Sequence, residues 1–301
     1  MSFVFGPVSS RRFGLSLGID LSPDRKRCNY DCLYCELKKA DPIAFFDSPI
    51  EPDAIIQEVE AALKTCTPNV LTITANGEPT LYPYLNELVD RLNAIKRNAK
   101  LMILSNASAI GVPNVSDALS KIDIVKLSLD AAEPIAFKKI DRPQKNYSDL
   151  NAIINGMIAF RKRYKGTLAI EILLVDKVND TPANFEALAL ALKKIAPDRI
   201  DIGTIERPSA YKVQAAAPER IRALADCLKG LNAQIIPNKH AVAKQSLNKS
   251  AILELLKRRS LGLSEAESIL DQSSLELLNS LVTEGAIVVK TQGGKTFYAL
   301  K

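Results

Sequence analysis

Apolar residues in this 301-residue chain form short, almost continuous runs, separated by segments in which apolar residues recur every three or four positions. Strands buried on both faces of a parallel sheet show such runs, and the recurring segments are typical of helices. The predicted strands are 15–21, 69–75, 100–106, 123–130, 167–175, 199–205 and 233–237. The predicted helices are about 53–63, 84–94, 115–121, 147–164, 183–195 and 218–229. This alternation predicts an α/β fold, an open or partial (β/α) barrel, with chemistry at the carboxyl ends of the strands.

The pattern changes after residue 240, where a polar linker follows the last predicted strand. Short helices are predicted at 251–258, 264–270 and 274–283, and strands at 286–290 and 295–300 around a Gly-containing turn. Three short helices and a hairpin are typical of a winged-helix unit. We therefore expect two domains, a barrel over residues 1–240 and a winged-helix-like domain over 248–301.

Three of the five cysteines follow the first predicted strand within "RKRCNYDCLYCELKK", at Cys28, Cys32 and Cys35. Three thiolates can hold three irons of a [4Fe–4S] cluster and leave the fourth iron open to a chelating ligand. The alternatives are a zinc site completed by a distant ligand, or unrelated buried thiols. Cys66 and Cys227 fall in predicted helices, and we interpret both as small core residues.

The second predicted strand ends at "TANGEPTL", which contains Gly77 and Glu78. A glycine lets a ligand approach the backbone closely. Glu78 is expected at the mouth of a pocket, where its carboxylate can accept hydrogen bonds from an ammonium group. The alternative is an ordinary turn with a solvated glutamate.

These motifs together resemble those of a known family. "CNYDCLYC" resembles the signature of the radical S-adenosylmethionine (radical SAM) enzymes, and "NGEPTL" resembles their glycine–glutamate motif. "FGPVSSRRFGLSLGIDL" and "FKKIDRPQ" are similar to a subgroup of small Fe–S oxidoreductases related to the radical enzymes of tRNA wybutosine synthesis. The resemblance spans residues 3–240 and implies a partial (β/α)6 barrel. The extra cysteines of the wybutosine enzymes are missing, so their substrate is not implied.

The resemblance also implies a site. The cluster would be held by Cys28, Cys32 and Cys35, and its open iron would bind the amino and carboxylate groups of SAM. Gly77 and Glu78 would hold the methionyl ammonium group, and Tyr34 would lie against the adenine. The remaining candidates for SAM contacts, at the ends of the third and fourth strands, are Asn106, Ser128 and Asp130.

Two further residues are candidates for contact with the substrate. Arg207 follows the sixth strand, and we expect it either to bind substrate or to form a structural ion pair. His240, the only histidine, either faces the substrate or lies on the surface.

The net charge of +6 permits a polyanionic partner without requiring one. Residues 248–301 contain seven Lys or Arg against six Asp or Glu, so the C-terminal domain could dock RNA or protein equally well. We expect a radical SAM enzyme that modifies RNA, specifically a tRNA base. Modification of a peptide or protein is the next alternative, and a non-enzymatic Fe–S sensor with a winged-helix output is the rival.

Cluster reduction would require an electron donor such as flavodoxin or ferredoxin. The chain shows no signal peptide and no run of 18 apolar residues. We therefore expect a cytoplasmic protein with no membrane span.

Overall fold

The computed structural model describes residues 2–10, 13–236, 244–292 and 295–301. Its main feature is a curved eight-stranded sheet in the order β1-β2-β3-β4-β5-β6-β7-β8. The strands are β1 (Val4–Ser10), β2 (Gly14–Asp20), β3 (Val70–Thr74), β4 (Lys100–Ser105), β5 (Ile124–Ser128), β6 (Thr167–Leu174), β7 (Arg199–Thr204) and β8 (Ala233–Ile235). Strands β2 to β8 are parallel, and β1 pairs antiparallel with β2 at one edge. The predicted parallel α/β sheet is confirmed.

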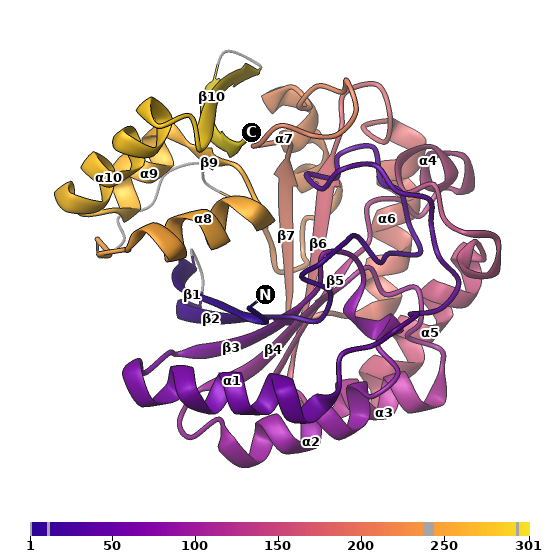
Figure 1. The fold of residues 1–301 in the computed structure, drawn as a ribbon. Helices are drawn as coiled ribbons and strands as arrows, with labels where there is room; N and C mark the ends of the chain where they lie inside the picture. The colour runs from indigo at the N-terminus through magenta and orange to yellow at the C-terminus, as the bar shows by residue number, and fades with distance from the viewer. Residues whose placement is uncertain (1, 11–12, 237–243, 293–294) are drawn as a thin grey trace.

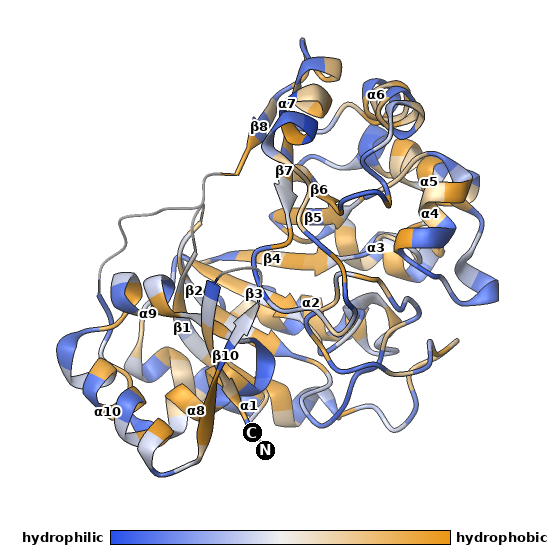
Figure 2. Cartoon of the chain, turned by 90° about the horizontal axis from the view of Figure 1, so that it is seen from above, coloured by the Kyte–Doolittle hydropathy of each residue, from blue (hydrophilic) through white to orange (hydrophobic). Residues whose placement is uncertain are grey.

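Helices connect the parallel strands and lie along one side of the sheet (Figure 1). They are α1 (Pro52–Thr65), α2 (Leu85–Ile95), α3 (Pro113–Ser120), α4 (Pro134–Ile140), α5 (Leu150–Arg163), α6 (Pro182–Ile195) and α7 (Pro218–Cys227), with short 3-10 turns at Pro79–Leu81 and Lys145–Tyr147. Proline at the start of α1, α3, α4, α6 and α7 suits a position whose N–H has no partner in the helix. The strands in between are mostly apolar, as their orange colour in Figure 2 shows.

Within residues 2–236 as described, the sequence pattern missed one strand, β1, and one α-helix, α4. Strand β1 contains Gly6 and Pro7, which interrupt the apolar run; proline is tolerated there because β1 is an edge strand. Helix α4 overlaps the start of the "FKKIDRPQ" segment and is only seven residues long. The two remaining cysteines differ from each other. Cys66 caps α1 from just outside the helix and packs, partly buried, against the core, whereas Cys227, the last residue of α7, is exposed and the expectation of a core residue is wrong there.

The C-terminal unit, residues 244–292 and 295–301, contains the expected elements. These are α8 (Lys249–Arg258), α9 (Leu263–Ile269), α10 (Gln272–Thr283), β10 (Ile287–Gln292) and β11 (Lys295–Leu300), with a two-residue strand β9 (Leu261–Gly262) beside β11. The unit has its own apolar core, which includes Leu255, Leu261 and Leu278. Its assignment as a winged helix stays a prediction.

Helix α8 places the C-terminal unit against the edge of the sheet (Figure 1). Val8 of β1 packs on the core of the C-terminal unit. Phe5, also in β1, contacts the C-terminal unit through its ring, whose centroid lies 4.5 Å from Cζ of Arg258. The unpredicted edge strand is therefore the surface on which the C-terminal unit docks. A search of the described residues finds no helix that is both long and apolar enough to cross a membrane.

Candidate functional site

The three cysteines lie on the long loop after β2, and this loop is fixed by backbone hydrogen bonds to residues 140–144. Asp31 N donates to Asp141 O at 3.1 Å, and Leu33 N donates to Ile140 O at 2.8 Å. Arg142, which adopts a positive φ of 45°, donates from Nε to Asp31 O at 2.6 Å. The "FKKIDRPQ" segment therefore has a structural role, because it holds the cysteine loop at the carboxyl edge of the sheet.

The cysteine side chains are half-buried and suit an iron–sulfur cluster in kind. Burial, and then the charge of Glu78, raises the pKa of the Cys28 thiol to about 12. Burial and Asp141 raise the pKa of Cys32 well above its usual value. Binding of a cluster must therefore release protons from these thiols. Three thiols on one loop are the donors that Fe–S clusters use. In the described ranges, no three metal-ligating side chains lie close enough together to hold a metal ion.

Gly77 is required by the cysteine loop itself. Its φ is +145°, and a Cβ added there would lie 1.8 Å from the carbonyl oxygen of Arg27. Arg27 N donates to Asn76 O, and Glu78 N donates to Arg27 O, both at 2.8 Å. We expected a ligand to approach the backbone of Gly77, but the backbone of Arg27 occupies that position. The contact holds the cysteine loop against the loop that follows β3.

Glu78 is buried, with 1% of its surface exposed, so the expectation of a carboxylate at the pocket mouth is wrong. Its Oε1 accepts hydrogen bonds from Thr80 N (3.0 Å), Thr80 Oγ1 (2.6 Å) and Ser105 Oγ (2.7 Å), and its Oε2 accepts one from Asn106 N (2.7 Å). Burial raises the pKa of this carboxyl group, while the four hydrogen bonds oppose that shift. Glu78 thereby joins the carboxyl ends of β3 and β4.

The other predicted SAM contacts lie close to the cysteine loop. Asn106 donates from Nδ2 to Asn29 Oδ1 at 2.9 Å and approaches Cys28 Sγ at 3.9 Å. Tyr34 donates from its hydroxyl to Asp130 Oδ2 at 2.5 Å, and burial raises the pKa of Asp130 to about 7. Ser128 lines a cavity of about 10 Å³ together with Asn106 and Asp130. The residues predicted from the sequence to contact SAM therefore lie near one another at the carboxyl edge of the sheet.

A larger cavity of about 450 Å³ lies between the carboxyl edge of the eight-stranded sheet and the C-terminal unit. The cysteine loop contributes Tyr34 and Cys35 to its lining, and the strand ends contribute Thr74, Asn76, Leu104 and Leu173. Arg207 follows β7 and lines the same cavity. Its Nη1 lies 3.2 Å from Glu36 Oε1 and its Nη2 lies 3.3 Å from Glu265 Oε1, so the expected ion pair exists. His240 lies outside the described residues.

Sequence reasoning missed three residues around this cavity, Asp20, Arg258 and Arg259. Asp20 ends β2, and an acidic residue at the carboxyl end of a parallel strand was an available signal. The two arginines belong to the segment "KRR", residues 257–259, where the sequence alone shows only a concentration of positive charge.

Comparison with known proteins identifies the family. The model of the Radical SAM superfamily matches residues 25–189, which contain the cysteine loop, Gly77, Glu78 and Asp130. The chain belongs to the radical SAM superfamily. It is therefore an enzyme that uses a [4Fe–4S] cluster and SAM, and the resemblance found in the sequence is confirmed.

The relatives and solved structures agree with this assignment. A "UPF0026 protein" of Helicobacter pylori (strain J99) is 41% identical over 302 residues, covering 99% of this chain and 97% of that protein. A "GTP 3',8-cyclase" of Streptomyces coelicolor is 25% identical over 159 residues, covering 52% of this chain and 45% of that protein. A structure of TYW1 with a lysine-pyruvate adduct bound has a TM-score of 0.53 at 20% identity, covering 71% of this chain and 73% of that one. This last likeness concerns the fold.

Proposed function

We propose that Cys28, Cys32 and Cys35 hold the [4Fe–4S] cluster and that the enzyme modifies RNA, specifically a tRNA base. The single observation behind the assignment of the site is that Cys35 and Tyr34 line the 450 Å³ cavity at the carboxyl edge of the sheet. Held by these cysteines and reduced, the cluster would supply the one electron for cleavage of SAM into methionine and a 5′-deoxyadenosyl radical. The chain's own residues orient SAM and exclude water from this cavity.

The SAM contacts are proposed along the ends of β3, β4 and β5. Oε2 of Glu78 accepts one hydrogen bond in the structure while Oε1 accepts three, so Oε2 retains acceptor capacity for the methionyl ammonium group. Gly77 would keep this carboxylate in register with the cysteine loop. Tyr34 would lie against the adenine, and Asn106, Ser128 and Asp130 would bind the remaining polar groups.

Two features are compatible with an RNA substrate. The net charge of +6 permits a polyanionic partner, and the GTP 3',8-cyclase that the chain resembles is named for a guanine nucleotide. The C-terminal unit, proposed to be a winged helix, would dock the RNA or a protein that presents it. A flavodoxin or ferredoxin would supply the electron, in the cytoplasm.

Anaerobic reconstitution tests the proposal. The full chain would be loaded with iron and sulfide, reduced with dithionite and mixed with SAM, with and without bulk tRNA, and 5′-deoxyadenosine would be measured. We expect about four irons per chain, as in one [4Fe–4S] cluster, and 5′-deoxyadenosine formation that increases with tRNA. A well-formed cluster that forms no 5′-deoxyadenosine under either condition would favour the sensor alternative. If 5′-deoxyadenosine formed at the same rate with and without tRNA, the result would contradict tRNA as the substrate.

A further inference from the structure

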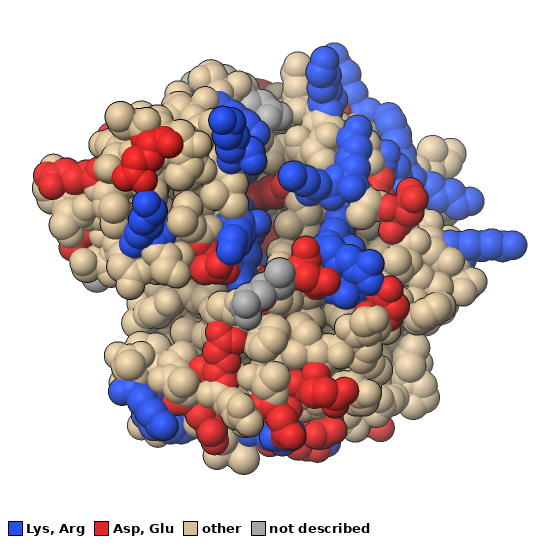
Figure 3. Space-filling view, in the orientation of Figure 1, with Lys and Arg blue, Asp and Glu red and all other residues tan. Residues whose placement is uncertain are grey.

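Two arginines from different domains share one carboxylate at the large cavity. Arg207 Nη2 lies 3.3 Å from Glu265 Oε1, and Arg259 Nη1 lies 2.6 Å from the same oxygen. Arg207 follows β7, whereas Arg259 and Glu265 belong to the C-terminal unit. Figure 3 shows the hollow between this unit and the rest of the chain, with Lys and Arg side chains along its edges.

The Arg207–Arg259 pair has more hydrogen-bond donors than its neighbours use. A guanidinium group offers five N–H donors. The hydrogen bonds among the described residues use two groups of Arg207, toward Glu36 and Glu265, and one of Arg259. Nε of Arg207 is buried with no hydrogen-bond partner in the described part of the chain. An unpaired buried donor is costly, so Arg207 retains a donor that its present neighbours leave unsatisfied.

The charges of the two arginines are unequally compensated. Burial, and then the neighbouring charge of Arg207, lowers the pKa of Arg259, whereas Glu36 and Glu265 outweigh the effect of burial on Arg207 and raise its pKa. Arg258, the third arginine of the cavity lining, is engaged by Asp20 and Glu254. Glu206 lines the cavity as well. The excess of donors is therefore concentrated at Arg207 and Arg259.

We propose that Arg207 and Arg259 bind an anionic group of the substrate, a phosphate or a carboxylate, by displacing Glu265. Planar guanidinium groups bind both kinds of oxyanion with paired hydrogen bonds. The inference rests on the proposed function, because Tyr34 and Cys35 line the same cavity and the bound anion would thus share the chamber with the cluster loop. It also gives the C-terminal unit a direct role in substrate binding.

Binding of small anions tests the proposal independently of catalysis. The full-length reconstituted protein, saturated with SAM, would be titrated with inorganic phosphate or with acetate at constant ionic strength. A ligand of the folded state raises the melting temperature as its concentration increases. A rise with phosphate supports the proposal and assigns a phosphate, and a rise with acetate supports it and assigns a carboxylate. The proposal is overturned if neither anion raises the melting temperature.

Paired variants give the result its specificity. Arg259→Gln should weaken anion binding by about tenfold, the effect of losing a charged hydrogen-bond donor. Glu265→Gln should strengthen it, because the competing carboxylate is gone. Both variants have matched controls at exposed side chains. Lys257→Gln on α8 removes a positive charge, as Arg259→Gln does, and Glu267→Gln on α9 removes a negative charge, as Glu265→Gln does. Equal effects of the controls would show only a general charge effect and would overturn the proposal.

Two further measurements separate the possible failures. If Arg259→Gln does not fold, Arg259→Lys keeps the charge, lacks the forked donor and should still weaken anion binding. SAM affinity should be unchanged in either variant; a parallel loss would assign the arginines to the carboxylate of SAM and would also overturn the proposal. Absence of 5′-deoxyadenosine would refute the proposed function while leaving the anion titrations interpretable.

Discussion

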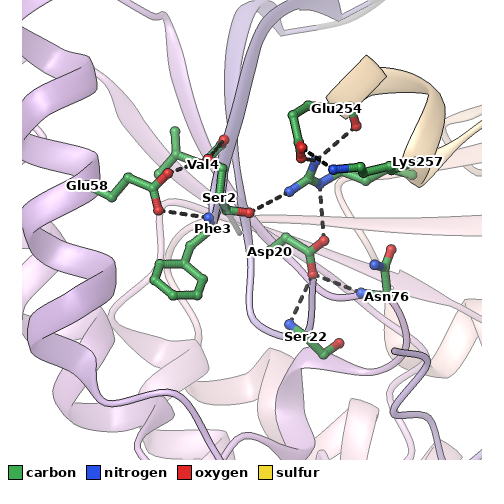
Figure 4. Close-up of polar contacts among 10 residues, drawn as sticks. Ser2, Phe3, Val4, Asp20, Ser22, Glu58, Asn76, Glu254 and Lys257 are labelled. Carbon is green, nitrogen blue, oxygen red and sulfur yellow. Dashed lines mark hydrogen bonds and ion pairs between the residues drawn. The ribbon is translucent and has the colours of Figure 1, made fainter. Parts of the chain in front are cut away.

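The Arg258 guanidinium of α8 pairs with the Asp20 carboxylate at the end of β2, with 3.1 Å between Nε and Oδ2. Both side chains are nearly inaccessible, at 8% and 1% exposure. The second oxygen of Asp20 accepts hydrogen bonds from Ser22 N and Asn76 N, each at 3.0 Å (Figure 4). One carboxylate therefore connects the C-terminal unit to the start of the cysteine loop and to the residue before Gly77.

Replacing Arg258 should destabilise the protein and loosen the SAM site together. Arg258→Met leaves the Asp20 carboxylate buried without its cation, and breaking a buried pair in this way typically costs about 3–5 kcal/mol. Urea unfolding followed by circular dichroism would measure the loss in the free energy of unfolding. The SAM dissociation constant should rise as well, because the Asp20 carboxylate, which accepts from Asn76 N, is no longer held in place by Arg258. Adding Asp20→Asn should recover part of the loss in stability.

Lys257→Met is the control for this prediction, since Lys257 lies on the same helix and its side chain is 53% exposed. If Arg258→Met and Lys257→Met changed the free energy of unfolding and the SAM dissociation constant equally, the Arg258–Asp20 pair would contribute nothing specific to stability or to SAM binding.

The parallel part of the sheet was predictable because burial on both faces leaves a local record. Strands β3 and β5 each have three apolar residues among five and are buried at four of the five positions, and flanking polar segments set their ends. Strand β1 leaves no such record, since its edge position tolerates Pro7 and its antiparallel pairing depends on β2. Local sequence therefore identifies strands whose own residues form an apolar run. It misses a strand such as β1, which forms only because it pairs with β2.

The site shows the same division. The cysteine spacing is local, and it identified the family directly. The burial of Glu78 could not be predicted, because its partners Ser105 and Asn106 come from the next strand end. Arg259 is a surface-like residue in sequence and becomes part of a cavity only after α8 docks on the barrel.

Removing Glu78 should destabilise the fold before it affects chemistry. In Glu78→Ala, the buried N–H groups of Thr80 and Asn106 lose their acceptor, at roughly 1–3 kcal/mol for each unsatisfied group. Glu78→Gln keeps one oxygen and should lose less. Urea unfolding gives the free energies, and Glu87→Ala on the surface of α2 is the control. A loss in Glu78→Ala no larger than that in Glu87→Ala would contradict the bracing role.

Cluster binding should depend on the three loop cysteines and on no other thiol. Cys28→Ala, Cys32→Ala and Cys35→Ala should each abolish the cluster, because a three-thiolate set has no spare ligand. Cys66→Ala and Cys227→Ala should retain the iron and sulfide content of the parent protein, since both thiols lie away from the loop. Chemical iron and sulfide assays, with visible absorbance, measure the outcome. Loss of half the iron in Cys66→Ala would indicate a second cluster.

Acid should weaken the contact between the C-terminal unit and the barrel through Glu265. Burial alone would raise the pKa of this carboxyl group, but the charges of Arg259 and Arg207 outweigh burial and lower the pKa from 4.5 to about 2. A lowered pKa stabilises the folded state above pH 4.5, and the contribution, about 3 kcal/mol, disappears as the pH falls toward 2.

Glu265→Gln removes this titration, so the difference in unfolding free energy between the parent protein and the variant should be largest at pH 7. It should begin to shrink near pH 4.5 and continue to shrink at pH 3. Urea unfolding at these pH values measures it, and Glu267→Gln, exposed on the same helix, should show no such trend. A difference that stayed constant from pH 7 to pH 3 would mean that Glu265 does not bear the charge that holds Arg207 and Arg259 together. The anion proposed to displace it would then have no carboxylate to replace.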